Sequence, residues 1–115
     1  MNKNKNKIKP IIGLIIFIIL ITCVICITYV KIHTFTLISK DNLKSEQIQP
    51  ISKEIKVSGT NDTNVVFTDV ENGNQYTIGY ITPGISESIQ LEKGKWYTVE
   101  GYGDITIKFV NIRID

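Results

Sequence analysis

The sequence predicts one N-terminal transmembrane helix followed by a small all-β domain, either an antiparallel β-sandwich or a small barrel. Three observations support this fold class. Residues 11–30 form a run of twenty residues without a charge. Beyond residue 54, short alternating runs are separated by Gly, Asn and Pro, which is the pattern of antiparallel strands. No amphipathic helical period fits this second part of the chain.

Residues 11–30 are long enough to cross a bilayer, because about 1.5 Å of rise per residue gives a helix of about 30 Å. Four lysines precede the run, at Lys3, Lys5, Lys7 and Lys9. Only Lys31 follows it directly. Since basic residues stay on the cytoplasmic side, we expect residues 1–10 to be a cytoplasmic basic flank. The protein is then a single-pass cell-membrane protein, a signal-anchor type, whose C-terminal part is extracytoplasmic.

Two alternatives to a spanning anchor are considered. A cleavable signal peptide also begins with lysines and an apolar stretch, but its apolar region is shorter and no small-x-small site follows Val30. Residues 20–23 resemble a bacterial lipoprotein motif ending in Cys23, with Thr22 where lipoproteins carry Gly, Ala or Ser. Lipidation of Cys23 therefore remains an alternative to simple spanning. Cys26 lies three residues further along one helical face, and two thiols alone make no zinc site.

The charges of the chain are divided between its two parts. Beyond Lys31 there are eight Lys and Arg residues and eleven Asp and Glu residues, a net charge of −3. The basic character of the whole chain therefore belongs to the anchor. A nucleic-acid partner is not indicated.

Residues 31–53 have a mixed polar composition with one proline, Pro50. We expect a stalk or linker here, with a short strand at 34–39. The extracytoplasmic β domain is expected over residues 54–115. Its predicted strands are residues 54–58, 64–70, 75–81, 85–91, 95–100 and 105–114.

The turn residues predict a strand register. Asn72 and Gly73 favour a two-residue type I′ hairpin loop. That loop pairs Asp69 with Tyr76, Phe67 with Ile78, and Val65 with Tyr80, and these residues share one face. Tyr76, Tyr80 and Tyr97 are then expected in the core.

Two further hairpins are predicted at residues 92–94 and 101–103, each closed by a glycine. They place one set of residues on a common face: Ile85, Ile89, Leu91, Tyr97, Val99, Ile105, Ile107 and Phe109. The apolar positions change parity in the last strand, from odd at Phe109 to even at Ile112. A bulge near Val110 and Asn111 would reconcile them.

Candidate contact residues follow from the same parity. Trp96 is opposite in parity to Tyr97, and Tyr102 lies at a loop tip, so these two aromatic residues are the candidates for partner contact. The competing interpretation is that both are ordinary strand-favouring residues on a half-buried sheet.

Catalytic and metal-binding signals are weak. The outer part contains one histidine, His33, with no cysteine or second histidine to join it. A pair of carboxylates of the glycosidase type would have to come from this set: Asp62, Asp69, Glu71, Glu87, Glu100 and Asp104. An oxygen-rich region around Asp69 and Asn72 suits either calcium or Asx turns, and the spacing does not fit an EF-hand loop. We expect no catalytic residue, no metal and no cofactor.

The segments VSG, VFTD and LEKGKWYTVEG resemble the oligonucleotide/oligosaccharide-binding barrel pattern, including that of the haem chaperones of cytochrome c maturation. The resemblance implies a small closed barrel as an alternative fold. The His-x-x-x-Tyr haem motif of those chaperones is absent, so the resemblance implies no function.

The leading hypothesis is a non-enzymatic, membrane-anchored bacterial protein whose outer domain acts as a protein-interaction or structural component of the envelope. Its partner is another envelope protein or a second copy of the same chain. A carbohydrate or cell-wall binding module is the alternative. A carboxylate-based hydrolase is the third hypothesis.

Overall fold

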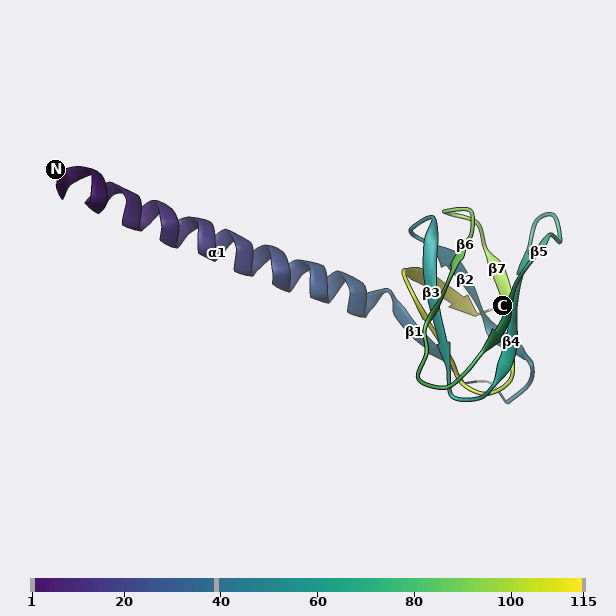
Figure 1. Ribbon diagram of the computed structural model, residues 1–115. Coiled ribbons are helices and arrows are strands. Elements are labelled where there is room, and N and C mark those ends of the chain that lie inside the picture. The colour runs from purple at the N-terminus through teal and green to yellow at the C-terminus, as the bar shows by residue number, and fades with distance from the viewer. Residues whose placement is uncertain (1, 39, 115) are drawn as a thin grey trace. The chain divides into compact units, whose positions relative to one another are not determined.

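The computed structural model describes residues 2–38 and 40–114, and the side chains from residue 7 onward. The chain divides into two compact units, a helical one over residues 1–32 and a β domain over residues 33–115 (Figure 1). The expected order of one apolar helix followed by an all-β domain is therefore confirmed.

Helix α1 (Asn2–Ile32) contains 31 residues. It includes the whole predicted span and continues through Pro10 into the basic flank. The apolar side chains from Ile11 to Ile32 are exposed around the helix, except for Val30, which is half-buried. The hydroxyl of Thr22 donates to the carbonyl oxygen of Ile18 at 2.8 Å, so this polar group needs no water. The helix is long and apolar enough to cross a membrane and is compatible with an anchor.

The β domain consists of two antiparallel sheets. Their strands are β1 (Thr34–Leu37), β2 (Leu43–Pro50), β3 (Glu54–Gly59), β4 (Thr63–Asp69), β5 (Gln75–Ile81), β6 (Glu87–Gln90), β7 (Tyr97–Glu100), β8 (Ile105–Lys108) and β9 (Val110–Ile114). One sheet has the order β1-β8-β3-β6 and the other has the order β5-β4-β7-β2-β9.

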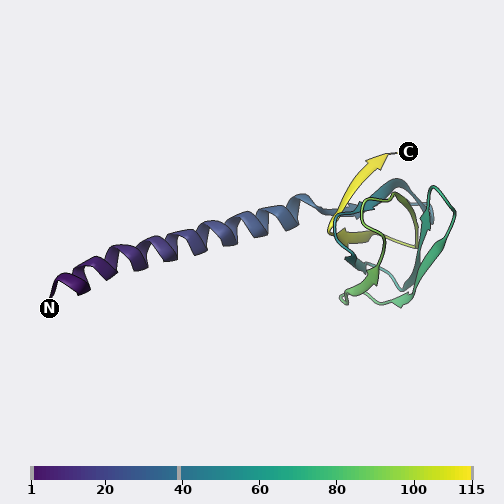
Figure 2. The same ribbon diagram turned by 90° about the horizontal axis from the view of Figure 1, so that it is seen from above.

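The apolar core contains residues from both sheets, as expected for a sandwich. Fully buried members are Leu37, Ile48, Ile55, Val57, Val65, Phe67, Tyr97, Val99, Ile105, Ile107 and Val110. The two sheets are not closed into a barrel (Figure 2). The barrel alternatives, including the oligonucleotide/oligosaccharide-binding type, are therefore corrected to a sandwich-like arrangement.

The structure corrects the predicted linker over residues 31–53. Strand β1 confirms the short strand expected at 34–39, whereas β2, which was not expected, occupies much of the remaining segment. Strand β2 is central, paired with β7 on one side and β9 on the other. Leu37 and Ile48 are fully buried. The mixed composition concealed β2, because Ile48 stands between two glutamines and little of the strand looks apolar.

The predicted change of parity near the end of the chain is confirmed, but the single strand over residues 105–114 with a bulge near Val110 and Asn111 is wrong: two strands, β8 and β9, occupy this segment. The chain breaks between β8 and β9 at Phe109, which has a positive φ of 69°. Ile107 before the break and Val110 after it are both fully buried. The change of parity arises because β8 and β9 belong to different sheets, and the chain turns from one sheet to the other at this residue.

The predicted register of the β4–β5 hairpin is wrong by two residues. The structure pairs Phe67 with Tyr76 and Thr68 with Gln75, so the loop is longer than Asn72-Gly73. The side chain of Asp69 accepts a hydrogen bond from the Glu71 N–H at 2.8 Å. This Asx turn widens the loop. A shift of two keeps the faces unchanged, which is why Val65 and Phe67 are nevertheless buried as expected.

Tyr80 is not in the core, contrary to the prediction. Thr63 pairs with Ile81, whereas Val65 pairs with Ile78. Two residues of β5, Gly79 and Tyr80, therefore stand opposite one residue of β4, Asn64, which is a bulge with one extra residue. The bulge exchanges the faces, so that Ile81 is buried and Tyr80 is 61% exposed.

The predicted hairpins at residues 92–94 and 101–103 are also wrong. Strand β6 pairs with β3, strand β7 pairs with β2 and β4, and β8 pairs with β1 and β3. Both connections therefore cross between the sheets. The predicted set of inward-facing residues is nevertheless largely correct. The odd-numbered apolar residues of β6, β7 and β8 face the core, whichever of the two sheets the strand belongs to. Ile85 is the exception and is exposed.

Candidate functional site

The outer face of the five-stranded sheet carries a row of polar side chains. Register partners share a face in antiparallel pairs, and one row crosses all five strands: Gln75, Thr68, Thr98, Gln47 and Arg113. Four of its five members are uncharged, with amide or hydroxyl groups that both donate and accept hydrogen bonds. We call this row, together with Trp96, the outer-face site.

Trp96 and Arg113 form a stacked pair at one end of the outer-face site. Trp96 directly precedes β7 and is half-buried, while Arg113 is on β9, an edge strand of the sheet. The guanidinium carbon of Arg113 lies 4.2 Å from the centre of the Trp96 ring. Its Nε donates to Oε1 of Gln47 at 2.9 Å. A cation over a ring is worth about 0.5–1 kcal/mol at an exposed position, and the Gln47 contact fixes the plane of the guanidinium.

A second set of amides continues this arrangement. The Gln49 side chain donates from Nε2 to the Gly94 carbonyl oxygen at 2.9 Å and accepts from Asn111 Nδ2 at 3.1 Å. These bonds join β2 and β9 to the loop just before Trp96. The backbone at Trp96 is held from the other side, where its carbonyl oxygen accepts from the Val70 N–H at 3.0 Å. The stacked pair is therefore supported by hydrogen bonds on both sides.

Tyr102 lies in the β7–β8 connection with its side chain exposed. Its N–H donates to Thr63 Oγ1 at 2.9 Å. Lys44 is buried and donates from Nζ to the Gly103 carbonyl oxygen at 2.7 Å. Burial lowers the pKa of Lys44 below its usual value, an effect that the negative charges of neighbouring carboxylates, chiefly Asp104, oppose. The loop that carries Tyr102 is thus held in position by Lys44 of β2, the strand that was not predicted from the sequence.

The structure does not bring the two predicted contact residues together. Trp96 precedes β7 and Tyr102 follows it, so they flank opposite ends of one strand. Tyr102 borders two small hollows of about 260 and 270 Å³ at its end of the domain. Trp96 lies beside Arg113 at the other end. Parity placed Trp96 on the outer side of the sheet as expected.

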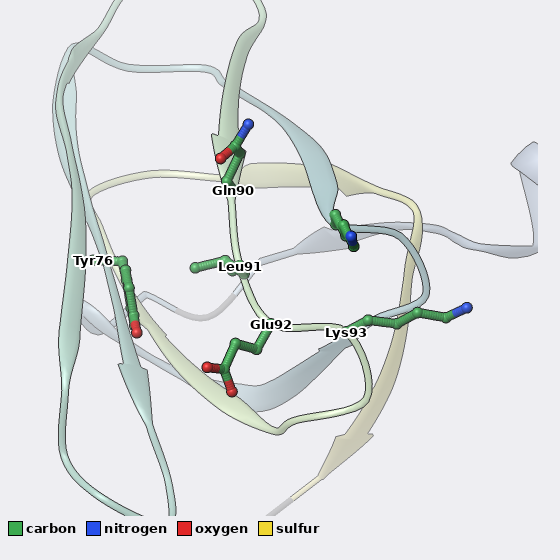
Figure 3. A pocket seen from close by; sticks show the side chains of 6 residues that line it. Tyr76, Gln90, Leu91, Glu92 and Lys93 are labelled. Carbon is green, nitrogen blue, oxygen red and sulfur yellow. The ribbon is translucent and has the colours of Figure 1, made fainter.

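A larger hollow, of about 510 Å³, lies between Tyr76 of β5 and the segment after β6. Figure 3 shows the Leu91 side chain directed towards Tyr76, whereas Lys93 extends away from it. The ring of Tyr76 meets that of Tyr97 edge-to-face, with 6.0 Å between centres. The Glu92 N–H donates to the Tyr97 hydroxyl at 3.1 Å, and burial raises the pKa of Tyr97. The hollow is open and mixed in character.

The predicted carboxylates are partly brought together, around Lys95. Its Nζ lies 3.3 Å from Glu92, 3.7 Å from Asp69 and 3.7 Å from Glu71. The hydrogen bond to Glu92 and the nearby negative charges raise the pKa of Lys95. Asp69 is 2% exposed and also forms the Asx turn described above, and Asn72 Oδ1 accepts from the Asn74 N–H at 2.8 Å. These contacts support the Asx-turn interpretation of the oxygen-rich region.

The remaining candidate residues lie apart from this arrangement. Cys23 and Cys26 are exposed on α1 as free thiols. His33 begins the β domain, and its carbonyl oxygen accepts from the Val110 N–H at 3.1 Å. Within residues 2–38 and 40–114, no group of three or more His, Cys, Asp or Glu side chains is arranged to hold a metal ion.

Arg113 and Gln47 are the members of the site that sequence reasoning missed. Gln47 lies in the segment interpreted as a linker, and Arg113 was placed only within the last strand. The odd parity of Gln47, Gln49, Asn111 and Arg113 against even Ile48 and Ile112 is the signal that identifies a polar outer face. That signal is readable only once β2 is recognised as a strand.

No protein family, no curated protein and no solved structure matches this chain.

Proposed function

We propose that this chain is a single-pass membrane protein whose extracytoplasmic β domain binds another envelope protein through the outer-face site, without catalysing a reaction. The observation that carries the proposal is the Trp96–Arg113 pair. Trp, Tyr and Arg are the residues most enriched among those that dominate binding energy at protein interfaces. Here Trp and Arg occur together, fixed by Gln47, so that little side-chain entropy remains to be lost on binding.

The position of the pair favours a protein partner. It lies beside a row of side chains with neutral amide and hydroxyl groups, three of which (Gln75, Thr68 and Thr98) are exposed or half-buried, and the rim of an interface is usually polar in this way. The net charge of −3 beyond Lys31 argues against nucleic acid as the partner. The apolar helix supplies the tether that keeps the domain at the membrane.

A photo-crosslinking amino acid at Thr98 tests the proposal in cells, with crosslinked products identified by mass spectrometry. The matched control carries the same amino acid at Ser88, on β6 of the other sheet. We expect a defined product from position 98 that disappears with Arg113→Ala and persists with Lys56→Ala, an exposed basic residue on β3. Equal products from both positions, or a product that Arg113→Ala leaves unchanged, would contradict the proposal.

The orientation is tested separately. In a variant without Cys23 and Cys26, a cysteine at Ser88 should react with a membrane-impermeant maleimide in intact cells. A cysteine at Asn6 should react only after permeabilisation. The reverse pattern would place the β domain in the cytoplasm and remove envelope proteins from consideration.

A glycan or cell-wall polymer is the second candidate ligand. The observation in its favour is the row of amide and hydroxyl side chains, since such groups pair with sugar hydroxyls as readily as with peptide groups. Arg113 already covers the ring of Trp96, which leaves less of it for stacking on a sugar. Pull-down with isolated cell-wall glycan distinguishes the two candidates, because Thr98→Lys should abolish glycan retention if this candidate is correct.

A further inference from the structure

Strand β5 is an open sheet edge, and its bulge at Gly79 and Tyr80 leaves the residues from Gln75 to Ile78 in regular pairing with β4. Among the described residues it is hydrogen-bonded to β4 only, and it lies at the outer border of the domain (Figure 1). Its seven residues, QYTIGYI, contain no charge and no proline. Natural edge strands are usually short, charged or interrupted by proline, because an open edge invites pairing with another chain. The other edges are better protected: β1 and β6 have four residues each, and β9 carries Arg113.

The hydrogen-bond pattern shows which backbone groups of β5 face outward. The N–H of Asp69 donates to the carbonyl oxygen of Asn74 at 2.9 Å. In an antiparallel ladder, residues that bond to the neighbouring strand alternate, so Tyr76 also bonds to β4. Gln75 and Thr77 consequently direct their N–H and C=O groups away from β4, towards the open edge. Thr77 is exposed on the outer side of the sheet.

We propose that β5 pairs with β5 of a second copy of this chain, antiparallel and about a two-fold axis at Thr77. In this register Thr77 faces Thr77 and Gln75 faces Gly79 of the other copy. The two Thr77 residues exchange N–H to C=O bonds, as in any hydrogen-bonded antiparallel pair. The same surface is used on both copies, which is the usual form of a two-fold dimer.

The composition of β5 favours a second copy as the occupant. Pairing a charged strand with itself places like charges opposite each other, which is destabilising, and β5 has none. Exposed apolar residues lie near both ends of the strand: Val70 (45%) follows β4 near the start of β5, Tyr80 (61%) is the last residue but one of β5, and Ile85 (52%) follows its end. Antiparallel pairing places the end of β5 that carries Tyr80 next to the start of β5 in the other copy, so the pairing covers part of this exposed apolar surface.

The proposed anchor strengthens the argument, and in this respect the inference rests on the proposed function. Two copies held in one membrane have their domains on the same side, which raises their effective concentration. The dimer also extends that function. The two five-stranded sheets become one continuous sheet, because β5 is the last strand of each. A two-fold axis perpendicular to the sheet keeps both outer-face sites on one side, so that a partner meets two Trp96–Arg113 pairs.

Substitutions at Thr77 test the pairing in the full chain, purified in detergent, by light scattering after size exclusion. Thr77→Lys puts two lysines opposite each other at the axis, and we expect dimerisation to weaken by about tenfold or more. The matched control is Thr98→Lys, on the same face of the central strand β7. It should leave the dimer intact. A mixture of the Thr77→Lys and Thr77→Glu chains should form dimers again, because opposite charges then face each other.

Crosslinking provides an independent readout that does not depend on a charged variant folding normally. In a variant without Cys23 and Cys26, Thr77→Cys should form a covalent dimer on mild oxidation and Thr98→Cys should not. A monomeric wild-type chain, a dimer that survives Thr77→Lys, or failure of the mixed chains to associate would each overturn the β5 pairing. None of these results changes the photo-crosslinking product at position 98, so failure of the pairing is distinguishable from failure of the proposed function.

Discussion

Substitution of Gly103 by alanine is expected to destabilise the β domain for two separable reasons. Gly103 has a φ of 79°, which costs an L-residue about 1–2 kcal/mol. An added Cβ would also lie 2.8 Å from Cγ and 3.1 Å from Cβ of Asn61. Inserting a methyl group into such a space typically costs about 1–3 kcal/mol. We therefore expect Gly103→Ala to lower the free energy of unfolding by about 3 kcal/mol.

The local hydrogen bonds oppose relaxation. Oδ1 of Asn61 accepts from the Thr60 hydroxyl at 2.9 Å, and the same hydroxyl accepts from the Asp104 N–H at 3.1 Å. Moving Asn61 away from the new methyl group would therefore disturb the contacts that hold the loop. Because of these contacts, we expect the steric clash to lower the free energy of unfolding and not to be relieved by movement of the Asn61 side chain.

Gly73→Ala is the matched control. Gly73 has a φ of 74°, but an added Cβ meets nothing within 4 Å. Its substitution should cost only the conformational part, about 1 kcal/mol. In an Asn61→Ala background the contacts with Oδ1 and Cγ are removed and only the 3.1 Å approach to the Cβ of residue 61 remains. The cost of Gly103→Ala should therefore fall to within about 1 kcal/mol of the cost of Gly73→Ala.

Urea unfolding of the full chain in detergent supplies the measurement, followed by the fluorescence of Trp96, the single tryptophan. The helix of the anchor does not contribute to this signal. Equal costs for Gly103→Ala and Gly73→Ala would refute the clash argument. An unchanged cost of Gly103→Ala in the Asn61→Ala background would refute the assignment of the clash to Asn61.

Two further predictions use the same unfolding assay. Burial raises the pKa of Tyr97 above its usual value of 10.0, so the stability linked to its proton is complete below about pH 10 and is lost as the pH rises through the raised pKa. Tyr97→Phe should therefore reduce the loss of stability above pH 10. Part of that loss should persist in the variant, because the pKa of Lys95 is also raised. An identical pH dependence in the variant and the wild-type chain would contradict the argument. Ile81 is 1% exposed, so Ile81→Ala should lower the free energy of unfolding by about 2–5 kcal/mol. Tyr80 is exposed, so Tyr80→Ala should change the free energy of unfolding by no more than about 0.5 kcal/mol. A larger cost at Tyr80 would disprove the bulge.

Prediction from the sequence succeeded where local pattern controls structure. Alternation identified the strands from β3 onward with small errors at their ends, except that β8 and β9 were predicted as one strand. The odd-to-even change indicated a bulge near Val110 and Asn111, close to the break that the structure has at Phe109. It failed at β2, where Ile48 is the fully buried large apolar residue and most of the remaining residues are polar, including Lys44, which is itself buried. A strand in the middle of a sheet cannot be recognised from composition when its outer face is polar.

The pairing of strands was less predictable than their positions. Turn residues suggested that β6 with β7, and β7 with β8, form hairpins, but both connections cross between sheets. Glycine in a left-handed conformation serves a crossing loop as well as a hairpin. The prediction of which side chains face the core was still correct for most residues, because the same residues face the core in either topology.

The sequence by itself determined that a long apolar helix precedes an acidic all-β domain, and which side chains of most strands face inward. Periods of two residues and runs of apolar residues are local properties, which explains why they are readable without a structure. Only the tertiary structure brought Gln47 and Arg113, 66 residues apart, to Trp96, and left β5 as an open edge. Both depend on which strands are neighbours, and long-range pairing is decided by the packing of the whole domain.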